Sequence, residues 1–196
     1  RQLLAQQEVG APEAVHAVFA VDNRHIPRLW QPGTGSITYD MGIYPIAFAH
    51  FVLGEPAEVW ANGRTRLNQM DEGALVRLNY DSGASASLLI SGTATHPSSA
   101  SISTENRLIT LEHPFFVPTT LTLSDKDLYF ESESWADESS AQGHDGLYYQ
   151  AEYFARFVSE GLVESPLHSH QEIVSNLRVA EEICRQLGAQ PGSLTS

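Results

Sequence analysis

The middle of the chain, residues 57–130, alternates short apolar segments with polar turns at a spacing typical of strands. The turns include Asp81-Ser82-Gly83 and Ser124-Asp125-Lys126-Asp127, whose residue types tolerate the dihedral angles of tight antiparallel connections. An earlier segment, Val15–Val21, is rich in β-branched and aromatic residues and also favours extended structure. The segments predicted as strands in the middle region are Val59–Leu67, Ala74–Tyr80, Ala84–Ile90, Ala100–Thr104, Leu108–Leu111, Leu121–Leu123 and Leu128–Phe130. Together they predict a meandering sheet.

Apolar residues at helical spacing lie on both sides of this region. Ser36–Leu53 follows that spacing, and Pro45 is expected to kink or interrupt the helix. Gly146–Glu160 is amphipathic. Ser169-His170-Gln171-Glu172 fits a capping box, in which a serine side chain and a glutamate side chain satisfy each other's backbone N–H groups, and it opens a predicted final helix.

Two further segments complete the expected organisation: a short helix at Arg1–Val9 and an exposed acidic loop or flap at Glu131–Asp145. Helices that bracket a run of strands predict an α+β two-layer sandwich, with a large, mostly antiparallel, open-faced sheet and helices packed on one face. We expect one domain over residues 1–196. Strand–helix alternation is missing, so no Rossmann domain is predicted in this chain. Small polar residues in the strands suggest that one sheet face meets solvent or a partner.

Charge and cysteine content narrow the function classes. The formal net charge of −13 repels phosphate backbones and anionic lipid, so neither nucleic acid nor a membrane is an expected partner. Cys184 is the only cysteine, which excludes an internal disulfide. The longest apolar stretch, Ile43–Leu53, is shorter than the roughly 20 residues of a membrane span. We expect a cytoplasmic location, while the start at Arg1 leaves a targeting segment upstream open.

Asp40 and Tyr44 are the candidate catalytic pair. They lie four residues apart, so on a helix they share a face and can converge on one small polar group. A tyrosine hydroxyl can donate a hydrogen bond to a developing alkoxide, and a carboxylate can orient a neighbouring cation that moves the proton. An unperturbed tyrosine titrates near about 10, so Tyr44 suits a donor better than a base at neutral pH. A helix cap and a half-buried core residue are the structural alternative.

The segment around this pair resembles a known family. Pro32–Pro45 is similar to the glycine-rich loop and the Asp-x-Gly-x-His/Tyr helix of the glucose–fructose oxidoreductase, inositol dehydrogenase and MocA family, most of all its dihydrodiol dehydrogenase branch. Further matches lie at Gly54-Glu55-Pro56-Ala57-Glu58-Val59 and at Gly161 with Glu164-Ser165-Pro166. The resemblance covers nearly the whole chain and implies the C-terminal, substrate-binding and oligomerisation domain of such an enzyme.

This resemblance implies a function for the parent enzyme. It would move a hydride between NAD or NADP and a hydroxyl or carbonyl carbon of a small sugar, polyol or dihydrodiol. Asp40 and Tyr44 would face the nicotinamide and the reacting oxygen, and Arg28 would border the substrate pocket, with a solvated loop arginine as the alternative. Tyr148 is a further substrate-binding candidate, for which helix-core and dimer-contact roles are equally open. The open sheet face would mediate a homodimer or higher oligomer.

The parts that would hold the cofactor are not found in this sequence. The family places its proton-transfer lysine in a Glu-Lys-Pro motif on the dinucleotide-binding domain, whereas the only lysine here is Lys126, in a polar turn. The segment Gly33–Thr38 has two glycines instead of a three-glycine fingerprint, and Thr34 and Ser36 depart from the family's glycine run. We therefore expect a missing N-terminal dinucleotide-binding domain as partner, and no cofactor bound to this chain alone.

Other interpretations of the chain stay in view. His168 and His170 form a His-x-His pair, but no cysteine and no obvious acidic third ligand accompanies them, so no metal site is expected. His50, on the apolar helix, is interpreted as a packing residue. A stand-alone binding or scaffold module without a redox role is the rival hypothesis, and a metal hydrolase built on the histidines is a third.

Overall fold

One large sheet organises the molecule, and within the described part of the chain its strands run in the order β2-β3-β4-β1-β5-β6-β7-β8. The computed structural model describes residues 2–127, 132–139, 141 and 143–192. The strands are β1 (Pro12–Ala20), β2 (Glu58–Thr65), β3 (Asp71–Asn79), β4 (Ser85–Ser91), β5 (Ala100–Thr104), β6 (Arg107–Leu111), β7 (Thr120–Asp125) and β8 (Ser132–Ala136). Every neighbouring pair is antiparallel except β1 with β4, which confirms the mostly antiparallel sheet that the sequence predicts.

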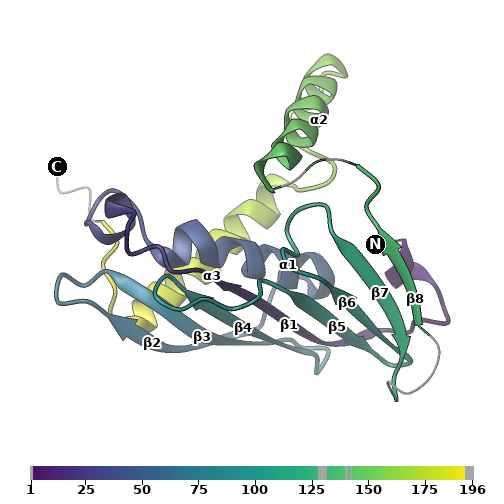
Figure 1. The fold of residues 1–196 in the computed structure, drawn as a ribbon, viewed down its shortest axis with the longest axis horizontal. Coiled ribbons are helices and arrows are strands. Elements are labelled where there is room, and N and C mark those ends of the chain that lie inside the picture. Colours follow the sequence, from purple (N-terminus) through teal and green to yellow (C-terminus); the bar gives the residue numbers. More distant parts are fainter. Residues whose placement is uncertain (1, 128–131, 140, 142, 193–196) are drawn as a thin grey trace.

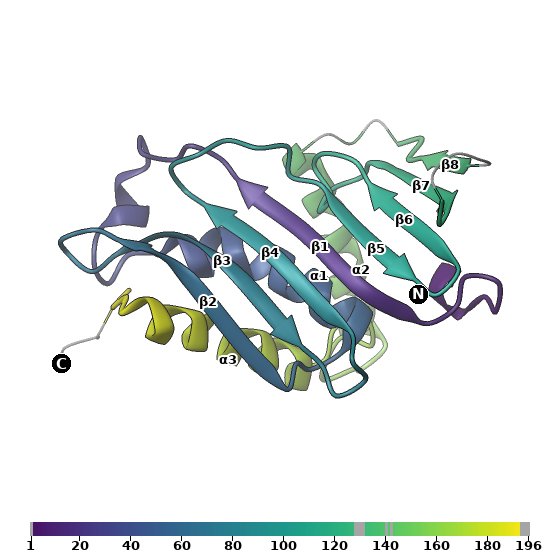
Figure 2. The same cartoon turned by 90° about the horizontal axis from the view of Figure 1, so that it is seen from below.

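Helices cover one face of this sheet. The elements are α1 (Ile43–Leu53), α2 (Leu147–Ser159), α3 (His170–Leu187) and the short turns η1 (Leu3–Ala5), η2 (Pro27–Trp30), η3 (Thr38–Gly42) and η4 (Gly143–Gly146). Figure 1 shows α1 and α3 lying along the sheet while α2 stands away from it, and Figure 2 shows the opposite face free of helices. This arrangement is the predicted α+β two-layer sandwich. Among the described helices, none has both the length and the apolar character needed to span a bilayer.

Alternation along the strands decides which face is covered. In β3, Ala74, Val76 and Leu78 are buried under the helices, whereas Leu75 and Arg77 between them are exposed. Successive strand side chains point to opposite faces, so this pattern gives the sheet one apolar face and one open face. The apolar face packs with buried residues of α1 and α3 in a single core.

The open face carries a row of mostly polar residues across the whole sheet. Directly paired residues share a face, and the register links the row from strand to strand. The row runs Trp60, Arg77, Ser87, His16, Ser101, Thr110, Thr122 and Ser134. His16 Nδ1 lies 3.0 Å from Ser87 Oγ, and Thr122 Oγ1 lies 2.8 Å from Ser134 Oγ. The polar, solvent-facing side expected from the small polar residues is thus present.

Two segments differ from the sequence prediction. The loop expected at Glu131–Asp145 contains strand β8, whose residues Ser132–Ala136 pair with β7 although all five are exposed. Backbone hydrogen bonds hold this strand without an apolar pattern, so hydrophobic periodicity could not reveal it. The opening helix expected at Arg1–Val9 is reduced to the 3₁₀ turn η1. The predicted strand Leu128–Phe130 lies outside the described residues.

Pro45 does not interrupt the helix in which it lies. Continuous helical structure runs from Ile37 through the π-helical turn η3 into α1, which ends at Leu53. Pro45 is the third residue of α1 and follows the π-helical turn closely, where the regular α-helical hydrogen bonding that a proline would break is already interrupted. The π-helical turn directly before α1 is the irregularity that the structure shows in place of the expected kink.

Candidate functional site

The candidate site is built around the start of the helix that carries Asp40 and Tyr44. The fully buried Asp71, the first residue of β3, points its carboxylate at this helix start. It accepts hydrogen bonds from Ser36 Oγ at 2.7 Å, from Thr38 Oγ1 at 2.7 Å and from the Thr38 backbone N–H at 2.6 Å. A carboxylate at a helix N-terminus satisfies free N–H groups and interacts favourably with the helix dipole. Asp71 therefore fixes the turn from which Asp40 projects.

Arg28 and Asp40 form an ion pair at the surface of this turn. Arg28 Nη1 lies 2.8 Å from Asp40 Oδ1, and both side chains remain partly open to solvent. Arg28 reaches Asp40 from η2, one 3₁₀ turn that begins at Pro27. The structure thus brings together two of the residues singled out in the sequence. Because a guanidinium stays protonated in proteins, Arg28 can hold and orient the carboxylate but cannot exchange a proton with it.

Tyr44 lies one turn further along the same helix, beside a group of aromatic rings. Its ring centroid is 5.3 Å from that of Phe19 on β1 and 4.8 Å from that of Phe116, and the side chain is 42% exposed. Phe19 and Phe116 also contact each other, with centroids 4.5 Å apart. The rings of Phe19 and Phe116 fix the position of the Tyr44 ring and leave part of the side chain accessible. A tyrosine held by its ring at the edge of a core can still present its hydroxyl to a ligand.

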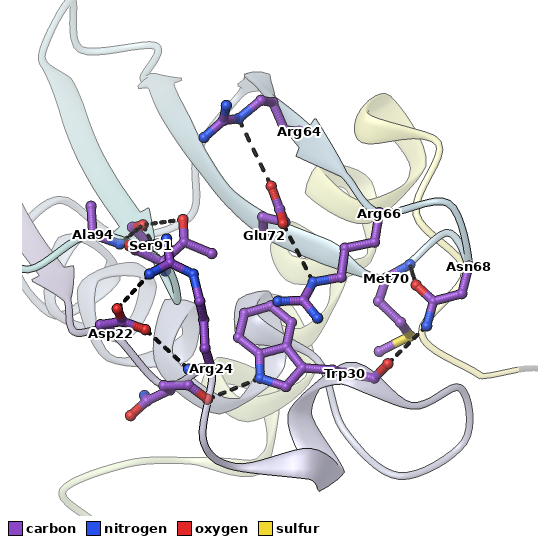
Figure 3. Close-up of polar contacts among 12 residues, drawn as sticks. Asp22, Arg24, Trp30, Arg64, Arg66, Asn68, Met70, Glu72, Ser91 and Ala94 are labelled. Carbon is purple, nitrogen blue, oxygen red and sulfur yellow. Dashed lines mark hydrogen bonds and ion pairs between the residues drawn. The ribbon is translucent and has the colours of Figure 1, made fainter.

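The loop that carries Arg28 is fastened to the β2–β3 hairpin. The guanidinium carbon of Arg66 lies 3.7 Å from the Trp30 ring centroid, and Arg66 Nε lies 3.3 Å from Glu72 Oε1. Asn68 Nδ2 donates to the Trp30 carbonyl at 2.8 Å, and Trp30 Nε1 donates to the Asn23 carbonyl at 2.9 Å (Figure 3). These contacts hold Trp30, the last residue of η2. The position of Arg28 therefore depends on residues far from it in sequence.

Gly35 is required where the loop passes under Arg28. A Cβ atom at Gly35 would lie 2.8 Å from the Arg28 carbonyl oxygen, which is too close for a carbon contact. We expect Gly35→Ala to force this backbone apart and to lower the free energy of unfolding by about 1–3 kcal/mol, as measured by urea denaturation. Gly146→Ala is the matched control, because its new Cβ would meet only a proline ring carbon at 3.3 Å. Equal stability of the two variants would contradict this account of the loop.

Tyr148, the fourth candidate from the sequence, lies elsewhere. It is on α2, largely exposed, and its ring contacts Tyr149 with centroids 5.6 Å apart. No contact that the structure describes for Tyr148 reaches Asp40 or Tyr44. The structure therefore groups Arg28, Asp40 and Tyr44 on one helix start and its flanking loop, and leaves Tyr148 apart from them. A substrate role for Tyr148 stays a prediction.

The histidines and the lysine have local partners. His168 Nδ1 lies 3.7 Å from Glu172 and His170 Nδ1 lies 3.7 Å from Glu164, and the described residues contain no group of three or more ligands placed to hold a metal ion. Ser169 forms the capping box with Glu172 that the sequence predicts. Lys126 Nζ pairs with Glu13 at 3.0 Å on the surface, as expected.

The buried Cys184 and the half-buried His50 have pKa values shifted from their usual range. Burial, together with the nearby Asp71 carboxylate, raises the pKa of the Cys184 thiol to about 12. Such a thiol is protonated at neutral pH and is no nucleophile. Burial lowers the pKa of His50, whose Nδ1 has no hydrogen-bond partner. His50 is half-buried, and this burial outweighs the opposing effect of the nearby Glu172 and Glu55, so the ring is neutral at neutral pH, in keeping with a packing role.

The described residues do not fit the phosphates of a dinucleotide. The Gly33 N–H is already used, donating to the Pro191 carbonyl at 3.2 Å, and the glycine segment follows a turn instead of a strand. The one parallel strand pair in the described sheet, β1 with β4, is joined through α1, β2 and β3 and not by a single crossover helix. A phosphate cradle needs free N–H groups at the junction of a strand and a helix, and this segment does not provide them.

Comparisons with known proteins give a consistent picture. A family model described as GFO/IDH/MocA C-terminal domain matches residues 1–109. Trans-1,2-dihydrobenzene-1,2-diol dehydrogenase of Homo sapiens is 25% identical over 191 residues, covering 96% of this chain and 57% of that protein. A scyllo-inositol 2-dehydrogenase (NADP(+)) of Bacillus subtilis is 28% identical over 149 residues, covering 76% of this chain and 43% of that protein. The chain therefore matches only about half the length of these curated relatives.

Solved structures agree on the fold. The aldose-aldose oxidoreductase of Caulobacter crescentus, complexed with glycerol, matches with a TM-score of 0.75 at 17% identity, over 95% of this chain and 56% of that one. At this identity the likeness speaks for the fold alone. The open antiparallel sheet with helices on one face is thus shared with an oxidoreductase that is longer than this chain.

Proposed function

Because the chain belongs to the family of GFO/IDH/MocA C-terminal domains, we propose that it is the substrate-side half of an NAD(P)-dependent oxidoreductase. The parent would act on a hydroxyl or carbonyl carbon of a small sugar, polyol or dihydrodiol. Relatives that carry such names, a dihydrobenzenediol dehydrogenase and an inositol dehydrogenase, support this substrate class. The dinucleotide would be held by a further part of the parent, since the glycine segment among the described residues does not fit its phosphates.

The observation that carries the proposal is the Arg28–Asp40 ion pair one turn before Tyr44. The ion pair fixes the direction of the Asp40 carboxylate, and the aromatic rings of Phe19 and Phe116 fix that of Tyr44. Two polar groups held independently on one helix turn are suited to orient one small hydroxyl-bearing molecule. A purely structural cap would not need an exposed arginine beside it.

The chemistry assigned to this chain is orientation and polarisation. A nicotinamide supplies the hydride chemistry when it is bound. Tyr44 would donate a hydrogen bond to the substrate oxygen and so stabilise the negative charge that develops when a carbonyl is reduced. Asp40, kept in place by Arg28, would accept a hydrogen bond from a hydroxyl or from a cationic group of the missing half. Arg28 would act as a positioning residue for Asp40.

Cofactor binding and turnover test this division of labour. We expect residues 1–196 alone to show no heat of binding on calorimetric titration with NAD(H) or NADP(H), and no turnover. The full-length parent is expected to bind one of the two and to reduce it with a trans-dihydrodiol or an inositol, followed by the absorbance of the reduced nicotinamide. Micromolar binding by residues 1–196, or a parent that binds neither cofactor, would contradict the proposal. The second result would favour a binding or scaffold module.

We further propose that the open sheet face associates two copies. Trp60, which is 58% exposed, is the first residue of the row on this face, and the exposed Leu75 lies diagonally across from it on β3. Large apolar side chains on a flat, open face are typical of subunit contacts. Light scattering is expected to give a dimer mass, and Trp60→Glu is expected to shift it towards the monomer. Trp135→Glu, which changes a 46% exposed tryptophan on the opposite sheet face, is the control and should leave the mass unchanged. A monomer mass for the unmodified chain at high concentration would contradict this contact.

A further inference from the structure

Helix α2 has an apolar side that nothing in the described chain covers. None of its residues is buried, and Figure 1 shows it standing away from the sheet on which α1 and α3 lie. Its exposed apolar side chains and those of the following loop include Leu147, Tyr149, Phe154, Val158, Leu162 and Leu167. Phe154 is 69% exposed. An amphipathic helix normally buries such a side, because exposed apolar area is unfavourable in water.

The apolar side of α2 faces a groove. The groove has a volume of about 910 Å³ and lies between α2, the loop 162–168 and the first residues of α3. Aromatic and aliphatic side chains such as Phe157 and Ile173 line it. Its acidic and basic side chains are Glu164, His168 and His170. An apolar centre with a sparse polar rim is typical of the surface on which another protein segment packs.

The start of α2 lies close to a loop that packs on the candidate site. A Cβ atom at Gly146, directly before α2, would lie 3.3 Å from Pro118 Cδ. Two residues before Pro118, Phe116 packs on Tyr44 with ring centroids 4.8 Å apart. The loop that holds Pro118 and Phe116 therefore lies between the candidate catalytic tyrosine and the start of the exposed helix.

We propose that the apolar side of α2 and its groove form the docking surface for the cofactor-binding half of the parent protein. This inference rests on the proposed function and identifies where the two halves meet. The curated relatives extend well beyond the part that this chain matches, so these relatives contain a further region large enough to be a domain. That domain must approach Tyr44 to bring a nicotinamide to the substrate, and the start of α2 lies beside Pro118, two residues from the Phe116 ring that packs on Tyr44. The open sheet face, proposed above as the contact between two copies, lies on the other side of the sheet (Figure 2) and so leaves α2 free for a different partner.

Hydrogen exchange, followed by mass spectrometry, tests this surface by comparing the full-length parent with residues 1–196. Amides in residues 147–167 are expected to exchange at least about tenfold more slowly in the parent, because an uncovered helix opens easily and a docked one does not. Phe154→Asp in the parent should remove this protection. Leu67→Asp, which changes a fully exposed leucine between β2 and β3, should not. Equal, rapid exchange in both proteins would overturn the proposal, and so would protection that appears in residues 1–196 as their concentration rises.

Cofactor titration of the same parent sample separates this inference from the proposed function. A parent that binds NAD(P) while residues 147–167 exchange rapidly would overturn the docking surface and leave the function standing. A parent that protects these residues but binds neither cofactor would overturn the function and, with it, the identity of the docked half. Protection together with cofactor binding supports both.

Discussion

Replacing Asp71 by alanine is expected to destabilise the chain by about 3 kcal/mol or more. The carboxylate is fully buried and accepts hydrogen bonds from Ser36 Oγ, Thr38 Oγ1 and the Thr38 N–H. Alanine leaves three buried donors without an acceptor, and each one costs about 1–3 kcal/mol in a site that water does not replace. It also removes the negative charge from the start of the helix. Urea denaturation followed by circular dichroism measures the loss.

Two further variants make the result specific. Asp71→Asn keeps the shape and one acceptor oxygen, so its loss of stability should lie between those of the alanine variant and the unmodified chain. Asp81→Ala, in the exposed turn between β3 and β4, removes an aspartate that supports no helix start and should change stability by less than about 0.5 kcal/mol. If Asp71→Ala is no less stable than Asp81→Ala, the hydrogen bonds at the helix start do not hold the site.

Changing Tyr44 to phenylalanine in the full-length parent is expected to lower kcat by about a hundredfold or more. The substitution removes the hydroxyl that is proposed to stabilise the developing oxyanion, while the ring keeps its contacts with Phe19 and Phe116. Stability should therefore change little, and KM should change less than kcat, because the lost interaction matters most in the transition state. Steady-state rates of nicotinamide reduction measure the effect.

Tyr39→Phe is the matched control for this experiment. Tyr39 lies on the same helix turn, and burial raises the pKa of its hydroxyl, so it remains a neutral group away from the ion pair. We expect its removal to leave kcat within a few fold of the unmodified parent. Equal losses in the two variants would show that the turn tolerates no change of any kind, and an active Tyr44→Phe parent would remove Tyr44 from the proposed chemistry.

The local sequence pattern was sufficient for most of the fold. The strand predicted at Ala74–Tyr80 and the capping box at Ser169 each depend on neighbouring residues, and the structure contains both, the strand as part of β3. Strand β8 could not be predicted in this way, because its pairing with β7 uses the backbone and its side chains are all exposed. Likewise, the sequence pattern does not indicate the π-helical turn directly before α1, next to which Pro45 lies within a continuous helix.

In the candidate site, too, local spacing indicates some features and not others. The spacing of Asp40 and Tyr44 predicts that they share a helix, and the structure places them on one. The Arg28–Asp40 ion pair and the support from Asp71 join residues 12 and more apart, so no local spacing indicates them. Asp71 lies three residues before the strand predicted at Ala74–Tyr80, and a lone aspartate there carries no signal of its own. The roles of Arg28, Asp40, Tyr44 and Tyr148 stay predictions until a parent enzyme is assayed.

The most direct test of the central claim is a crystal structure of the full-length parent with NAD(P) and a bound diol. The account predicts that the Tyr44 hydroxyl lies within about 2.6–3.2 Å of the oxygen on the reacting carbon, with the nicotinamide held by residues outside this chain on the far side of that carbon. A nicotinamide bound away from the Arg28–Asp40 pair, with Tyr44 in contact with solvent alone, would contradict it.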